Sequence, residues 1–266
     1  MFNAPHEFTS EIILKTKEFG ADLVGVVNIE ELKRSPSHSI FERLDTYTGV
    51  GSKGEGKPSL TWPKSASSII IMALEHPEDN EPLDWWRVGF SGGTRGNRIL
   101  MEIVENVAKW LKEEHSVGTC MLPYHIEHGG LFLKDAAVIA GLGIIGKSNL
   151  LVTPQLGPRV RLRALAADIE LEPTSPIDFN PCRGCQSFCR KACPRNAFNE
   201  KLYLSEKYGI DKLPGRDGNY NRSLCNLQME ADIAKSKEVD GEEVGSSREV
   251  VRYCRKCEFA CPVGIR

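Results

Sequence analysis

The chain has 266 residues, of which 41% are hydrophobic and 26% charged, and this is enough for one large core or a core with a small satellite domain. Its 34 Lys and Arg nearly balance its 36 Asp and Glu, so the net charge gives no support for a nucleic-acid or anionic-membrane partner. The first residues, MFNAPHEFTSE, lack the basic and apolar regions of a signal peptide, and no apolar run is long enough to span a bilayer. We therefore expect a cytoplasmic protein.

Helices and strands are expected to alternate in the first part of the chain. EFTSEIILKTKEFG predicts a helix capped by Thr9 or Ser10, and ADLVGVV predicts a buried strand after it. SSIIIMAL predicts a second buried strand, and NRILMEIVENVAKWLKEEH predicts an amphipathic helix. A long loop is expected over residues 46–63, where glycine and polar residues dominate. The alternation predicts an α/β fold.

Two further segments precede a change in composition. LFLKDAAVIAGLG favours a helix, and NLLVTPQLGPRVRLRALAADIEL favours strands or a hairpin. The proline-rich EPTSPIDFNP then reads as a linker, and the chain beyond it is loop-rich and rich in cysteine. We place a domain boundary near Pro176, which gives domains 1–175 and 176–266.

The stretch GLGIIGKS, residues 141–148, matches both the dinucleotide fingerprint GxGxxG and the phosphate loop GxxxxGK[ST]. Both patterns need a strand before the glycines and a helix after them, so that the helix N-terminus faces the phosphates. Here a predicted helix precedes and a predicted strand follows, which argues against both. Two interpretations stay open. The glycines end a helix and allow a close approach, or they admit a ligand to which Lys147 and Ser148 donate hydrogen bonds.

Eight of the nine cysteines lie in the last third of the chain, in CRGCQSFCRKACP, SLCNLQ and CRKCEFACP. Thiolates at such spacings hold 4Fe–4S clusters in two-cluster ferredoxins, where the cysteine before proline ligates the other cluster. The last run is one ligand short, and Cys225 supplies the missing thiolate. Crossing the outer ligands gives one cluster on Cys182, Cys185, Cys189 and Cys261 and the other on Cys193, Cys225, Cys254 and Cys257.

Structural zinc is the alternative for these cysteines. Zinc takes four thiolates, usually as two separated CxxC pairs, and two runs that each end in Cys-Pro fit this pattern poorly. Three residues rather than two separate Cys185 from Cys189, so the geometry there is expected to differ from that of ferredoxins. Cys120 stands apart, and we expect it to be a small buried hydrophobe.

With these motifs in view, the sequence resembles the epoxyqueuosine reductase and reductive dehalogenase superfamily of cobalamin-dependent iron–sulfur enzymes. The resemblance lies in FGADLVGVV, in AAVIAGLGIIGKSNLLVTPQLGPRVRL and in the cysteine runs with RSLCNLQME, which follow in this order. It implies a flavin-free, nitroreductase-like α/β (α+β) domain that binds cobalamin over residues 1–175. It also implies a ferredoxin-like domain with two 4Fe–4S clusters over residues 176–266.

The resemblance implies roles as well. Electrons would pass from an external donor, such as a ferredoxin or flavodoxin, through the outer cluster to the inner one, on Cys182, Cys185, Cys189 and Cys261, and then to cobalt. The resulting Co(I) would drive reductive cleavage of a small organic substrate. The residues expected at the cobalamin face are Gly141, Gly143, Gly146, Lys147, Ser148 and Asn149.

The proton donor is the least defined residue of the expected site. By position, Glu127 replaces an aspartate of the epoxyqueuosine branch, and a glutamate can donate a proton if burial raises its pKa. A solvated loop carboxylate is the alternative. Tyr124 is a rival because the dehalogenase branch uses a tyrosine, and His125 and His128 are also within reach.

Three departures leave the substrate open. The sequence carries neither the helical-repeat tail that epoxyqueuosine reductases use toward tRNA nor a twin-arginine signal, and the expected acidic residue is changed. We expect a cobalamin-dependent reductase. The alternative is a two-cluster electron-transfer protein that serves a partner enzyme or reduces a corrinoid.

Overall fold

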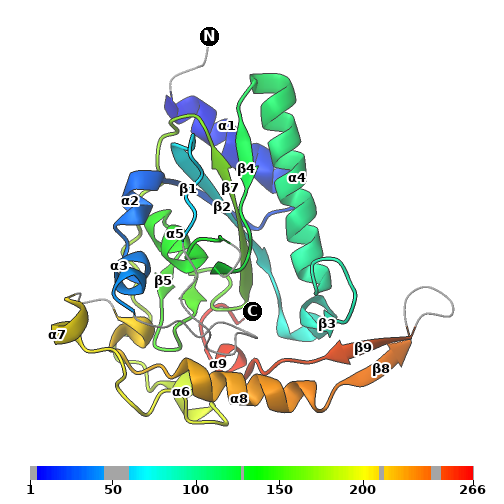
Figure 1. Cartoon of the computed structure of the whole chain (residues 1–266), viewed down its shortest axis with the longest axis vertical. Helices are drawn as coiled ribbons and strands as arrows, with labels where there is room; N and C mark the ends of the chain where they lie inside the picture. The colour runs from blue at the N-terminus through cyan, green and yellow to red at the C-terminus, as the bar shows by residue number, and fades with distance from the viewer. Residues whose placement is uncertain (1–4, 45–59, 127–128, 210–212, 241–246, 266) are drawn as a thin grey trace.

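The computed structural model describes residues 5–44, 60–126, 129–209, 213–240 and 247–265. Its centre is a four-stranded sheet in the order β1-β2-β7-β4, and every pairing in it is antiparallel (Figure 1). The strands are β1 (Leu23–Asn28), β2 (Ser68–Glu75), β7 (Val160–Ala167) and β4 (Thr119–Met121). The two predicted buried strands are confirmed as β1 and β2. Their apolar runs are buried because helices cover both faces of the sheet.

One face of the sheet is covered by α1 (Pro5–Glu18) and α4 (Arg95–His115) (Figure 1). The Thr94 hydroxyl caps α4 by accepting a hydrogen bond from the Asn97 N–H, and Ile103, Val107 and Leu111 are buried beneath it. Each such side chain contributes about 1.5–3 kcal/mol by leaving water. The predicted helices are confirmed, but the predicted cap of α1 is wrong. The helix begins at Pro5, and the buried Thr9 hydroxyl inside it accepts a hydrogen bond from the Glu172 N–H.

The opposite face carries a second apolar cluster under smaller elements. These are α2 (Ile29–Lys33), α5 (Leu133–Ile139) and the hairpin of β5 (Ile144–Ile145) and β6 (Leu151–Val152). The next helix, α3 (Pro36–Glu42), places Ile40 in a separate small cluster with Tyr208 and Leu213. The predicted order of helix, glycine stretch and strands is confirmed here. The expected loop over residues 46–63 lies mostly outside the described residues.

The chain beyond residue 176 runs below the sheet and has mostly short elements (Figure 1). They are α6 (Phe188–Lys191), α7 (Ser205–Tyr208), the 3-10 turn η3 (Pro214–Arg216), α8 (Arg222–Ile233), β8 (Lys237–Asp240), β9 (Ser247–Val251) and α9 (Lys256–Phe259).

The two predicted domains are joined through a shared small sheet. The 3-10 segment η1 (Glu78–Asp84) leads into β3 (Trp86–Arg87), and β3 pairs with β9 from the C-terminal part, in the order β3-β9-β8. The fold is thus a mixed one of the α+β kind, with an antiparallel sheet and helices on both of its faces. The two domain types implied by the resemblance stay predictions.

Candidate functional site

Four cysteines from both ends of the C-terminal part line one small cavity below the β5–β6 hairpin. They are Cys182, Cys185, Cys189 and Cys261, the set predicted for the inner cluster. Lys147, Ser148 and Val152 complete the wall on the side of the hairpin, and Phe188 and Pro262 lie on the other sides. The sulfur of Cys182 lies close beneath Gly146, 3.4 Å from where a Cβ of that residue would be. The fold therefore brings together thiols that are far apart in sequence.

The thiols of this cavity also affect one another's pKa values. Burial raises the pKa of the Cys189 thiol, and Cys261 and Cys182 raise it further. Burial likewise raises the pKa of Cys261, with further contributions from Cys182 and Cys185. Iron bound here would displace the protons, because thiolates are the ligating form.

The other four cysteines form a second group around α8 and α9. Burial raises the pKa of Cys254, and Cys225 and Cys193 add to the shift. Burial raises the pKa of Cys257 to about 12, and Glu258, Cys225 and Cys254 contribute. The members of this group are the second predicted set, Cys193, Cys225, Cys254 and Cys257.

The two groups meet between the short helices α6 and α9. Cys189 lies on α6 and Cys257 on α9, and the Cys189 thiol contributes to the raised pKa of Cys257. The extra residue between Cys185 and Cys189 is accommodated at Ser187, whose backbone adopts a left-handed φ of 59°. The two groups are therefore neighbours at this point.

The donor sets fit clusters better than single ions. Across the part of the chain that the structure describes, no three His, Cys, Asp or Glu side chains converge closely enough to hold one metal ion. A zinc site requires that close tetrahedral convergence, whereas a 4Fe–4S cluster is a larger body held by thiolates around it. Eight thiols in two groups of four match two clusters.

The glycines of GLGIIGKS pack against protein backbone. A Cβ on Gly141, whose φ is +75°, would lie 2.2 Å from the Ser175 carbonyl oxygen, and one on Gly143 would lie 2.2 Å from that of Val152. Protein packing thus explains why side chains are excluded at these two positions. That these residues and Gly146 face a corrin stays a prediction.

The three polar residues after the glycines bind the chain on either side. Lys147 Nζ donates to the Cys185 carbonyl at 2.9 Å, and Ser148 is buried at the wall of the cysteine cavity. The Asn149 carbonyl accepts from Lys134 Nζ at 2.5 Å, and its Oδ1 accepts from the Gly215 N–H at 3.3 Å. Burial lowers the pKa of that lysine to about 8. These contacts tie the turn of the hairpin to the first cysteine run, to α5 and to η3.

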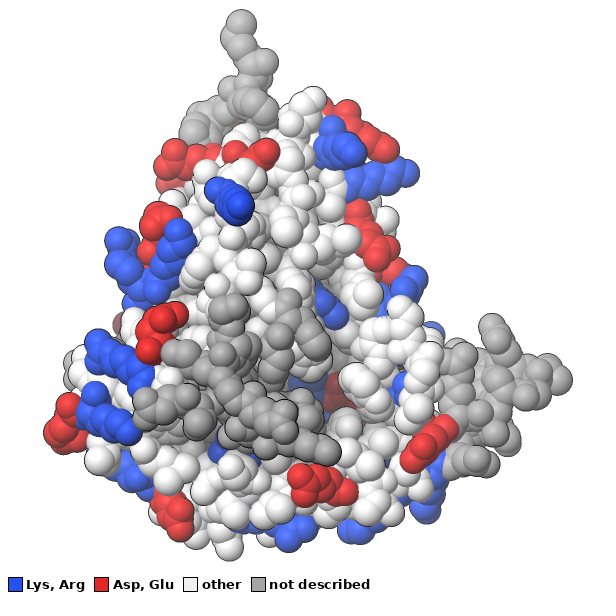
Figure 2. Space-filling model, viewed as in Figure 1, with Lys and Arg blue, Asp and Glu red and all other residues white. Residues whose placement is uncertain are grey.

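Of the predicted proton donors, the structure describes Tyr124. Its side chain is exposed, with the ring edge-on to His125 at 5.0 Å and the Arg163 guanidinium 5.2 Å from its centre. Glu127 and His128 lie outside the described residues, so their roles stay predictions. A hollow opens on the face shown in Figure 2, and basic and acidic side chains are visible within it.

The sequence predicts only a strand for the alternating arginines of RVRLR, and the structure gives these arginines a further role. Arg161 and Arg163 lie on β7, on the side of the sheet that carries α4 farther along, and Arg159 directly precedes the strand. Arg163 Nε donates to Asn97 Oδ1 at 2.9 Å, whereas Arg159 and Arg161 reach the segment that carries the last cysteines. Their spacing alone could have indicated one shared face.

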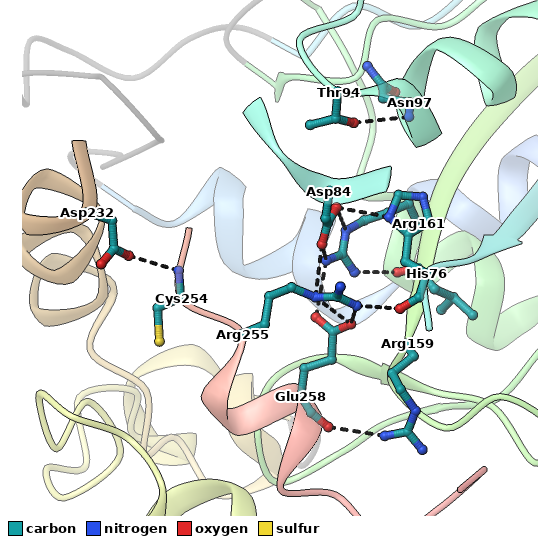
Figure 3. A network of polar contacts seen from close by, with 11 residues as sticks. His76, Asp84, Thr94, Asn97, Arg159, Arg161, Asp232, Cys254, Arg255 and Glu258 are labelled. Carbon is teal, nitrogen blue, oxygen red and sulfur yellow. Dashed lines mark hydrogen bonds and ion pairs between the residues drawn. The ribbon is translucent and has the colours of Figure 1, made fainter. Parts of the chain in front are cut away.

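A buried polar network joins this arginine row to α9 (Figure 3). Asp84 pairs with Arg161, with Arg255 at 2.9 Å and with the His76 ring at 2.9 Å, and Glu258 pairs with both arginines. Burial by itself would raise the pKa of Asp84, but the His76 hydrogen bond and the two guanidiniums hold it well below its usual range. Burial would lower the pKa of Arg161, yet Glu258, Asp84 and Tyr124 raise it overall.

One prediction about cysteine is wrong. Cys120 was expected to be buried, but it is exposed on β4, at the edge of the sheet. A three-residue edge strand leaves one of its faces without a covering helix at this point. Burial depends on what packs above a strand, and no local pattern carries that information.

The fold is that of known reductases. It superposes on selenomethionine-labelled epoxyqueuosine reductase with a TM-score of 0.63 at 20% identity, covering 98% of this chain and 66% of the other. It superposes on a catabolic reductive dehalogenase in complex with 3-bromo-4-hydroxybenzoic acid with a TM-score of 0.62 at 17% identity, covering all of this chain and 33% of the other. Both likenesses show that this chain has the fold of those two proteins.

The sequence comparisons extend this likeness. The chain is 32% identical to epoxyqueuosine reductase of Gloeobacter violaceus over 272 residues, which cover 97% of this chain and 76% of the relative. It is 28% identical to tetrachloroethene reductive dehalogenase of Dehalobacter restrictus and spans 40% of the length of that relative. No family model matches. The chain belongs to the epoxyqueuosine reductase and reductive dehalogenase superfamily.

Two observations bear on the predicted partners. No described helix has both the length and the apolar character needed to cross a membrane. A similar structure, with a TM-score of 0.64 at 19% identity, is epoxyqueuosine reductase with a tRNA-Tyr stem loop, covering 98% of this chain and 66% of the other. That complex leaves the prediction of no nucleic-acid partner untested for this chain.

Proposed function

We propose that this protein is a reductase that holds two 4Fe–4S clusters and cobalamin and cleaves a carbon–oxygen or carbon–halogen bond of a small organic substrate. The observation that carries the proposal is the convergence of Cys182, Cys185, Cys189 and Cys261 on one cavity. Membership of the superfamily supports the reductive chemistry. Cobalamin, when bound, would supply a strongly reducing cobalt centre.

The cysteine groups have separate tasks in this proposal. The group of Cys193, Cys225, Cys254 and Cys257 accepts electrons from an external donor, because the Cys254 residue is exposed to solvent. The group around Cys261 lies under the β5–β6 hairpin, next to Lys147 and Ser148. The short path from Cys257 to Cys189 carries electrons inward.

Tyr124 is the proposed proton donor among the described residues. Its exposed side chain can reach a bound substrate, and the Arg163 guanidinium lies at its ring. Arg161 is near enough for Tyr124 to contribute to its raised pKa. A Tyr124→Phe variant should keep cobalamin and both clusters while turnover falls about 100-fold or more.

The deciding experiment is an anaerobic titration of the reconstituted protein with cobalamin. Visible absorbance reports binding, and electron paramagnetic resonance of the Co(II) form reports whether the lower base has left the cobalt. Tight, stoichiometric binding supports the reductase. Intact clusters without cobalamin binding would contradict it and favour the two-cluster carrier, for which the protein packing around Gly141 and Gly143 already gives a ligand-free explanation. Absence of clusters would contradict both functions.

A further inference from the structure

We infer that Arg159 and Lys147 are positioning residues for the inner cysteine cage, which we define as Cys182, Cys185, Cys189 and Cys261. Each of the two residues holds the backbone of a different cysteine run. The inference rests on the proposed function only in that it takes the cage to hold a cluster. It concerns how Cys261, which is distant in sequence from the other three ligands, reaches them.

Arg159 holds the run that carries Cys261. The residue is buried at 5% exposure, and its guanidinium donates to three backbone carbonyls of one segment. Nη1 donates to the Cys261 carbonyl at 3.2 Å and to the Glu258 carbonyl at 3.4 Å, and Nη2 donates to the Val263 carbonyl. Figure 3 shows this side chain pointing toward the end of α9. Bonds from a buried cation to carbonyls on both sides of Cys261 restrict where its thiol can lie.

The turn before Arg159 is shaped to receive the same segment. Thr153 and Gly157 close this turn with two backbone hydrogen bonds, of 2.9 and 3.0 Å. A Cβ on Gly157, where φ is +58°, would lie 1.9 Å from the Val263 carbonyl oxygen, so the two backbones are in direct contact. Only glycine permits this approach. The turn and Arg159 together form a cradle for residues 261–264.

Lys147 holds the other run from the other end of the same hairpin. Its ammonium donates to the Cys185 carbonyl at 2.9 Å. The Lys147 carbonyl in turn accepts from Arg190 Nε at 2.9 Å, and Arg190 directly follows Cys189 in the chain. The hairpin therefore contacts both cysteine runs through its backbone and side chains, and the cavity lies between these contacts.

This arrangement differs from one in which the cysteines alone define the cage. In the two-cluster ferredoxin pattern the spacing within each run brings the thiolates together. Here two cations outside the cysteine runs make four hydrogen bonds to their carbonyls. We therefore expect the inner cluster to depend directly on Arg159 and Lys147, two residues of the first part of the chain.

The test uses the full-length protein, reconstituted anaerobically, with three methionine variants: Arg159→Met, Lys147→Met and Arg163→Met. Methionine keeps much of the apolar stem and removes the donors. Arg163 is the matched control because it lies on the adjoining strand and bonds to Asn97, away from the cysteines. Iron and sulfide per chain, and electron paramagnetic resonance of the reduced clusters, are the readouts.

We expect Arg159→Met and Lys147→Met to lose about half of the iron, with the outer-cluster signal retained, and Arg163→Met to keep both clusters. An Arg159→Lys variant keeps the charge but not the fork of donors, and it should release inner-cluster iron to a chelator about tenfold faster. Gly157→Ala tests the cradle without removing a charge, and it should give the same loss as Arg159→Met.

Two kinds of failure can be told apart. Wild-type protein that binds no iron would defeat the proposed function. Fully loaded wild type beside Arg159→Met and Gly157→Ala variants that keep all their iron would defeat the inference alone. If Arg159→Met does not fold by circular dichroism, the chelator rate of Arg159→Lys decides, and a wild-type rate would overturn the inference.

Discussion

The two cysteine groups are built on different supports. The inner group, Cys182, Cys185, Cys189 and Cys261, lies against the β5–β6 hairpin, where Lys147 and Arg159 hold its backbone. The outer group shares the buried network around Arg255 and Glu258 with the first part of the chain, and it has further supports within the C-terminal part itself. Asp232 on α8 accepts from the Cys254 N–H at 2.8 Å, and the Cys193 sulfur accepts from the Ala197 N–H at 3.4 Å.

Because their supports differ, the two cysteine groups depend on different parts of the fold. The outer group has supports on α8 in addition to the buried network at α9, whereas the inner group lies directly against side chains of the first part of the chain. The junction between the first part of the chain and the C-terminal part is the buried network of Asp84, Arg161, Arg255 and Glu258 (Figure 3). Loosening the first part should therefore remove the inner cluster first.

The strongest test of the division is removal of one thiol from each group. The Cys261→Ala variant should lack the inner cluster and the Cys225→Ala variant the outer one, so that each variant keeps about half of the iron. Electron paramagnetic resonance should show a different surviving signal in the two variants. Identical surviving signals, or full iron content in either variant, would contradict the crossed ligand sets.

The junction itself can be weakened through Asp84. Asp84→Ala leaves Arg161 and Arg255 without their shared carboxylate in a buried site. We expect this variant to have a free energy of unfolding about 3–5 kcal/mol lower than that of the wild type. Urea unfolding of the loaded protein measures this. Because the Asp84 pKa is depressed, its contribution is complete above the carboxyl's ordinary pKa and is lost only as the pH falls through the lower folded value.

The order of losses in this variant sharpens the comparison. Inner-cluster absorbance should disappear at a lower urea concentration than the outer-cluster signal. The surface pair of Arg98 and Glu102 offers a control, since Glu102→Ala removes an exposed ion pair and should change stability by less than about 1 kcal/mol. Simultaneous loss of both clusters at one urea concentration would show that the two groups share one support.

Acid offers a way to loosen the first part without touching a cysteine. His38 is buried against Trp62 and Phe132, its Nδ1 bonds to the Ser35 hydroxyl, and burial lowers its pKa to about 4 despite the nearby Asp135 charge. As the pH falls below 6.5, His38 therefore takes up a proton in the unfolded chain, whereas in the folded protein it does so only near pH 4. Stability should fall by about 2 kcal/mol between pH 7 and pH 5 from this group.

The measurement compares urea unfolding of wild type and His38→Gln at both pH values. Glutamine keeps hydrogen-bonding capacity but does not titrate, so the variant should lack this part of the pH dependence. Equal slopes in the two proteins would place the acid sensitivity elsewhere.

The smallest expected effect concerns the outer group alone. Asp232→Asn replaces a charged acceptor of the Cys254 N–H by a neutral one. This change should lower the free energy of unfolding by about 1 kcal/mol. Iron release from the outer cluster to a chelator should quicken several-fold, with the inner cluster unchanged. Faster release from the inner cluster instead would mean that the two groups are not independent.

Regular elements were predictable because their signals are local. The apolar runs of β1 and β2 and the stripe of α4 appear directly in the sequence, and the helix before GLGIIGKS with a strand after it argued correctly against a phosphate loop. Strand direction was not predictable, since the antiparallel order β1-β2-β7-β4 depends on which strands meet. The exposure of Cys120 was missed for the same reason.

The sequence by itself was enough to predict the two cysteine sets, because spacing within a run and the proline after its last cysteine restrict which thiols can share a cluster. Tertiary structure decided what surrounds them. Arg159 and Cys261 are far apart in the chain, as are Lys147 and Cys185, and Asp84 meets Arg255 only across the junction. Ion pairs and hydrogen bonds of this kind depend on atoms within a few ångströms of each other, and that proximity exists only once the sheet and the cysteine segments have packed together.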